Sequence, residues 1–130
     1  MDSRLKILCE ELGKMSSSQA ADWLMTNYPV DKADYGDAIT MLSHRSWKRP
    51  DQIRLAQHYL KKMPFASSKV YEAFASFMSF ELFLKSINEQ VPTDKSDIDL
   101  LLYYLLPVLE KSARSDVDRE LVKSFIADVR

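Results

Sequence analysis

Glycine and cysteine are scarce in this sequence of 130 residues, which contains 2 glycines, 5 prolines and a single cysteine, Cys9. So few turn-forming residues disfavour a many-stranded β-sandwich, because tight turns between strands draw on glycine and proline. One cysteine cannot form a disulfide within the chain or supply a thiolate cluster for a metal. No run of about 18 apolar residues occurs either, so we expect no membrane-spanning helix and no membrane partner.

The first residues also lack the unbroken apolar stretch of roughly 7–15 residues that a secretory signal needs. Charged side chains (Asp2, Arg4 and Lys6) are interspersed with apolar ones over this segment. Together with the single cysteine, this pattern predicts a cytoplasmic protein.

Neither sign of charge dominates, since 18 lysines and arginines stand against 19 aspartates and glutamates for a net charge of −1. The balance excludes a chain that is polybasic overall. Hydrophobic residues make up 46% and charged residues 28%, which is typical of a globular protein. The length predicts one domain over residues 1–130.

Apolar residues recur at helical spacing (i, i+3, i+4, i+7) along most of the chain, and no strand-like alternation competes with it. Seven segments are separated by proline, glycine or polar residues, over approximately 5–12, 17–28, 35–42, 50–63, 67–90, 94–112 and 115–129. Pro107 either kinks the sixth segment or divides it in two. The short connections favour antiparallel neighbours. We therefore predict an all-α bundle of about six to eight helices in stacked antiparallel hairpins.

The segment over 67–90 is predicted to be the central helix of this compact bundle. Phe74, Phe77, Phe80 and Phe83 recur every three residues, which spreads their rings over about half of the helix circumference. A helix that is apolar over so wide an arc must be enclosed by neighbouring helices.

No catalytic arrangement stands out in the sequence. His44 and His58 lie fourteen residues apart on different predicted elements, and neither a metal-ligand pair nor a glycine-rich phosphate loop occurs. Cys9 lies within an apolar quartet, where a thiol behaves as a small hydrophobic group. We expect no enzyme, no cofactor and no metal. A scattered site around the histidines, Tyr103 and Tyr104 is the least favoured alternative.

Acidic residues gather at the starts of two predicted helices. They are Asp94, Asp97, Asp99, Asp116, Asp118 and Glu120. Carboxylates there complement the helix dipole, and they can also form an acidic face that docks on a basic protein surface. Tyr103 and Tyr104 lie beside this face, and tyrosine is enriched at interface centres. The pattern predicts a non-enzymatic protein-binding module, most concretely an immunity-type protein that neutralises a basic-surfaced, cytosol-acting toxin such as a nuclease.

The alternative prediction rests on the basic segment 44–62, which carries six lysines and arginines against one carboxylate. Arg45, Trp47, Lys48 and Arg49 cluster in an expected loop, and Arg54 follows. Cations beside an aromatic ring can contact phosphates and bases, which indicates a nucleic-acid-binding or regulatory protein. The same residues also fit a solvated loop with Trp47 folded onto the core.

Overall fold

The computed structural model describes all residues from Met1 to Arg130 and contains eight α-helices, one short 3₁₀ helix and no strand. The all-α prediction is confirmed. None of the helices combines the length and the apolar character needed to cross a membrane. The helices group into two compact units, Met1–Tyr59 and Leu60–Arg130. A single domain over residues 1–130 stays a prediction.

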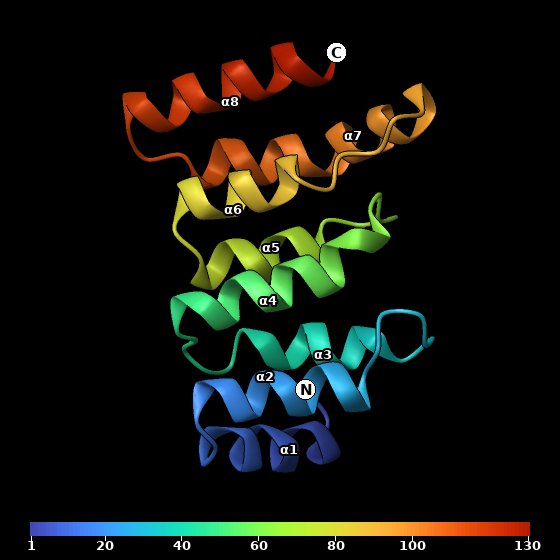
Figure 1. Cartoon of the computed structure of the whole chain (residues 1–130), viewed down its shortest axis with the longest axis vertical. Coiled ribbons are helices and arrows are strands. Elements are labelled where there is room, and N and C mark those ends of the chain that lie inside the picture. The colour runs from blue at the N-terminus through green and yellow to red at the C-terminus, as the bar shows by residue number, and fades with distance from the viewer. The chain divides into compact units, whose positions relative to one another are not determined.

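The N-terminal unit consists of α1 (Ser3–Gly13), α2 (Ser17–Asn27), α3 (Tyr35–Leu42) and α4 (Arg49–Tyr59). Consecutive helices of this unit alternate in direction (Figure 1), α1 packs on α3, and α2 packs on α4. Packing of each helix on the next but one is the arrangement of stacked helical hairpins. Both tryptophans, Trp23 on α2 and Trp47 in the connection between α3 and α4, belong to this unit.

Tyr59 ties the end of α4 to the end of α2. Its side chain is fully buried, and its hydroxyl donates to the carbonyl oxygens of Tyr28 at 2.9 Å and Leu24 at 3.3 Å. Burial, with a smaller contribution from Tyr28, raises the pKa of Tyr59 above its ordinary value, because a buried phenolate would be poorly solvated. The hydroxyl therefore stays a neutral donor, and the carbonyl of Tyr28 is the nearer of its two acceptors.

The C-terminal unit opens with the 3₁₀ helix η1 (Leu60–Lys62) and continues with α5 (Lys69–Phe77), α6 (Phe80–Asn88), α7 (Lys95–Ser112) and α8 (Asp116–Val129). Here α5 packs on α7 and α6 on α8, and contacts also join α5 with α6 and α7 with α8. Pro107 lies inside α7, which runs through it as one helix. Because proline has no N–H, the carbonyl of Tyr103 lacks its usual donor four residues later.

The prediction of one Phe-rich helix over 67–90 is wrong, because this segment forms the two helices α5 and α6. The chain turns at Met78 and Ser79, whose backbones are extended, with ψ of 150° and 151°. The hydroxyl of Ser79 accepts a hydrogen bond from the N–H of Leu82 at 3.2 Å. Serine is among the preferred N-cap residues, and here it begins a new helix within an apolar run.

The turn divides the four phenylalanines into two pairs. Phe74 and Phe83 are buried in the core, with 0% and 1% of their surface exposed. Phe77 and Phe80, which flank the turn, are only partly buried. The four phenylalanines are therefore divided between two helices joined by a turn. They do not lie on one straight helix that neighbouring helices enclose.

Ser79→Ala removes the cap of α6, and we expect it to lower the free energy of unfolding by about 1 kcal/mol. Urea denaturation followed by circular dichroism measures this difference. Ser79→Asp keeps a side-chain acceptor and is the matched control, with an expected loss of less than about 0.5 kcal/mol. Equal losses in the two variants would contradict the capping role.

Tyr59→Phe leaves the carbonyl of Tyr28 without its buried donor, and we expect a loss of about 1–2 kcal/mol in the free energy of unfolding. Tyr103→Phe makes the same chemical change on a side chain that is 72% exposed. Its expected effect in the same urea titration is within about 0.5 kcal/mol. A control variant as unstable as Tyr59→Phe would show that the buried hydroxyl is not the cause.

Candidate functional site

Arg45 and Trp47 of the basic segment are tied into the N-terminal unit. Trp47 is buried, and its indole N–H donates to the carbonyl of Leu42 at 2.9 Å. The guanidinium of Arg45 lies 4.7 Å from the centre of the Trp47 ring and donates to the carbonyls of Leu12 at 2.6 Å and Met15 at 3.2 Å. These contacts fasten the connection between α3 and α4 to the end of α1.

The side chain of Arg54 also forms contacts within the N-terminal unit. It pairs with the buried carboxylate of Asp51 at 3.1 Å and with Asp22 of α2. Lys48 and Arg49 are exposed at the start of α4 and form no ion pair. Of the five residues predicted to bind nucleic acid, the structure leaves these two cations available, because the other three side chains support the packing.

The first group of predicted acidic residues lies at the start of α7. Asp94 is the N-cap, and its carboxylate accepts hydrogen bonds from the hydroxyl and N–H of Ser96 and from the N–H of Asp97. The bond from the Ser96 hydroxyl, followed by that from the Asp97 N–H, stabilises the charged form and lowers the pKa of Asp94. Asp97 and Asp99 are exposed, and their carboxylates have no hydrogen-bond or ion-pair partner.

The second group lies at the start of α8, and each of its members has a local partner. Asp118 accepts from the N–H of Arg114 at 3.0 Å. The other two form ion pairs one turn along the helix: Asp116 with Arg119 at 2.9 Å and Glu120 with Lys123 at 3.2 Å. The two groups lie at opposite ends of α7, whose 18 residues extend over about 27 Å. The structure therefore does not bring them together into one acidic face.

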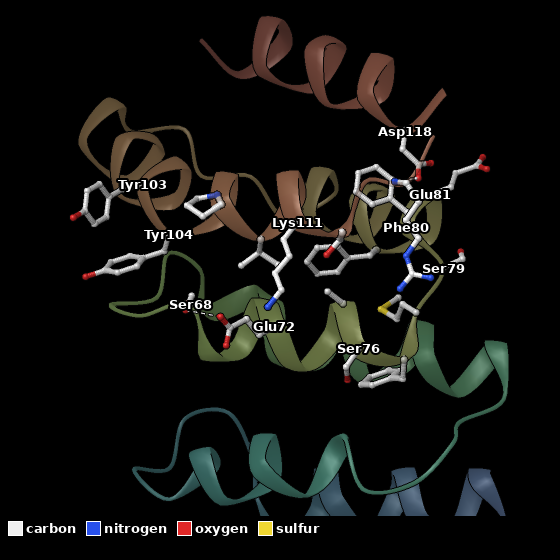
Figure 2. Close-up of a pocket in the computed structure, with 18 residues that line it drawn as sticks. Ser68, Glu72, Ser76, Ser79, Phe80, Glu81, Tyr103, Tyr104, Lys111 and Asp118 are labelled. Atoms are coloured by element: carbon white, nitrogen blue, oxygen red, sulfur yellow. Dashed lines mark hydrogen bonds between the residues drawn. The ribbon is translucent and has the colours of Figure 1, made fainter. Parts of the chain in front are cut away.

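An open groove of about 1340 Å³ lies on the C-terminal unit, lined from both sides by α5 and α7 (Figure 2). It includes the turn between α5 and α6 and the start of α8. Its side chains combine large apolar groups with charges: Glu72, Phe77, Phe80, Glu81, Tyr103, Tyr104, Pro107, Val108, Lys111, Arg114 and Asp118.

Two tyrosines stand at one end of this groove (Figure 2). The rings of Tyr103 and Tyr104 meet edge to face, with centroids 4.9 Å apart and planes at 90°. Tyr103 is 72% exposed, whereas Tyr104 is half-buried. Tyr103 and Pro107 also line a second concavity of about 350 Å³, whose lining includes Asp99 and Glu110. Tyr103 is therefore shared by two concave surfaces.

Charged side chains face each other across the groove without forming ion pairs. Lys111 extends from α7 toward Glu72 on α5 (Figure 2), and Glu72 accepts a hydrogen bond from the hydroxyl of Ser68 at 3.1 Å. Glu81 and Asp118 lie at the end away from the tyrosines (Figure 2). The groove lining contains serine hydroxyls but no histidine or cysteine.

No family model, curated protein or solved structure matches this chain. Across the described residues, no group of three or more His, Cys, Asp or Glu side chains is arranged to hold a metal ion. The groove offers aromatic and aliphatic side chains together with charged groups that form no ion pair.

The sequence predicts three of the groove residues, Tyr103, Tyr104 and Asp118, and misses the contribution of α5 and α6. The predicted helix over 67–90 encloses all four phenylalanines of that segment, which leaves no ring for a surface groove. The signal that points to the groove is Ser79, because a serine directly before a helical apolar repeat marks a helix start.

Asp94→Asn tests the charged cap of α7 through its pH dependence. Because the pKa of Asp94 is lowered in the folded chain, the charged cap adds stability above the ordinary aspartate pKa of about 4. That stability is lost as the pH falls through the lower folded-state pKa. We expect the natural chain to exceed the variant in stability at about pH 7, and the gap to close toward about pH 2.

Urea titrations over a pH series measure this gap. Asp97→Asn removes the same charge from the first turn of α7 without touching a side-chain cap, and it serves as the control. A gap for Asp94→Asn that is independent of pH would show that the charge of the cap does not matter.

Proposed function

We propose that this chain is a non-enzymatic protein-binding module that recognises its partner through the groove of the C-terminal unit, with Tyr103 at the centre of the contact. The observation that carries the proposal is the position of Tyr103. Its ring is 72% exposed and is shared by the two concave surfaces. Buried tyrosines concentrate binding energy at protein interfaces, because the ring is large and rigid and the hydroxyl can hydrogen-bond.

The size of the groove supports a macromolecular partner. Pockets for small molecules measure about 300–1,000 Å³ and enclose most of the ligand. The groove here is larger, at about 1340 Å³, and it is open to solvent. A segment of a protein fills such a surface better than a metabolite does.

The exposed carboxylates of α7 support a partner with a basic surface. Asp97, Asp99 and Glu110 of α7 are all exposed and unpaired. Unpaired surface carboxylates steer a cationic partner and accelerate its association. The most concrete form of the proposal is an immunity-type protein that neutralises a cytosol-acting toxin, such as a nuclease, whose phosphate-binding cleft is cationic. The carboxylates would then occupy the positions of substrate phosphates.

Tyr103→Ala tests the proposal in affinity capture from the cells that produce this protein. We expect the variant to retain about tenfold less of one stoichiometric partner than the natural chain, because interface tyrosines often contribute more than about 1.4 kcal/mol. Mass spectrometry identifies and quantifies the partner.

Ile7→Ala is the matched control, because Ile7 is a 60% exposed apolar side chain on α1. This variant should capture as much partner as the natural chain, and circular dichroism verifies that both variants are folded. Undiminished capture by Tyr103→Ala would contradict the proposal. Capture of nucleic acid that depends on Lys48 and Arg49 would instead favour the alternative prediction.

A further inference from the structure

We infer that the groove between α5 and α7 binds a basic amphipathic helix of the partner. This inference rests on the proposed function and specifies the element that occupies the same site. It follows from the shape of the groove, from its uncovered apolar side chains and from its excess of carboxylates.

The dimensions of the groove fit a helix. The lining residues of α7 run from Tyr103 to Ser112, a length of about 14 Å. Three turns of helix are about 16 Å long and, at a diameter of about 10 Å, occupy about 1,300 Å³. The groove volume of about 1340 Å³ accommodates such a helix. An extended segment would normally add to the edge of a sheet, and this chain contains no strand.

The lining of the groove includes large apolar side chains that the unit does not enclose. Phe77 and Phe80 lie on either side of the turn and are only partly buried, Tyr104 is half-buried, and Pro107 is exposed. A helix with apolar residues at i, i+3 or i+4, and i+7 presents a stripe that covers such side chains. The ridges of α5 and α7 would then pack on the docked helix as helices pack on one another within the unit.

The charge around the groove selects a basic helix over an acidic one. The lining holds three carboxylates, of Glu72, Glu81 and Asp118, against the two cations Lys111 and Arg114. The concavity on which Tyr103 also borders adds Asp99 and Glu110 against one cation, Arg130. Because Glu72 and Glu81 are exposed and form no ion pair, lysine or arginine side chains on the polar face of a docked helix can reach them.

The test uses three fluorescein-labelled synthetic peptides of about 14 residues and the full chain, with binding followed by fluorescence anisotropy. The first is an amphipathic leucine–lysine helix, the second has glutamate in place of each lysine, and the third carries the same number of lysines on a proline-rich backbone. We expect the first to bind about tenfold or more tightly than either of the others, and added salt to weaken its binding. Equal affinity for the acidic helix or for the proline-rich peptide would overturn the inference.

Charge reversal locates the site. Glu72→Lys with Glu81→Lys should weaken binding of the leucine–lysine helix about tenfold and strengthen binding of the leucine–glutamate helix. Glu10→Lys with Glu89→Lys changes the net charge equally at exposed positions outside the groove, and it should leave the affinity within about twofold. Equal losses in the two double variants would indicate unspecific attraction and overturn the inference.

The experiments distinguish a failure of the helix inference from a failure of the proposed protein-binding function. If Tyr103→Ala abolishes partner capture while the leucine–lysine helix does not bind, the helix inference is overturned and the protein-binding function stands. If the helix binds with the expected selectivity while Tyr103→Ala leaves capture unchanged, the inference is supported and the role of Tyr103 in the proposed function is contradicted.

Discussion

The turn at Met78 and Ser79 sets the order of helices in the C-terminal unit, and the hydrogen bond from the N–H of Leu82 to the hydroxyl of Ser79 caps the helix that follows this turn. The turn ends one helix and begins another within a run of apolar residues that would otherwise form a single straight helix. The resulting hairpin places Phe74 and Phe83 in the core and leaves Phe77 and Phe80 beside the turn. Both of these rings line the groove against α7, so the turn supplies part of that surface.

In the N-terminal unit, cations that look free in the sequence serve the packing. Arg45 donates to the carbonyls of Leu12 and Met15, at and just beyond the end of α1, where the negative end of the helix dipole favours a positive charge. Arg54 compensates the buried carboxylate of Asp51. A basic segment next to a tryptophan is therefore not by itself evidence of a phosphate-binding surface, because helix ends and buried carboxylates attract the same side chains.

The sequence predicts the all-α fold and most of its helices, because apolar spacing records which face of each helix is buried. The caps Asp94 and Ser115 at the starts of α7 and α8 can be predicted for the same reason, since they act on backbone groups only a few residues away. Contacts between distant segments cannot be predicted this way. The partners of Arg45 lie about thirty residues away, and the groove depends on how α5 lies against α7, which no local pattern encodes.

Because both tryptophans lie in the N-terminal unit, tryptophan fluorescence reports on this unit alone. Emission from Trp23 and Trp47 follows α2 and the connection before α4, whereas the phenylalanines and tyrosines around the groove contribute little at the red end of the spectrum. Far-ultraviolet ellipticity, in contrast, sums the helices of both units. Melting curves recorded by the two signals coincide when the units unfold together and separate when they unfold one after the other, so the distribution of indole rings reports on cooperativity without any label.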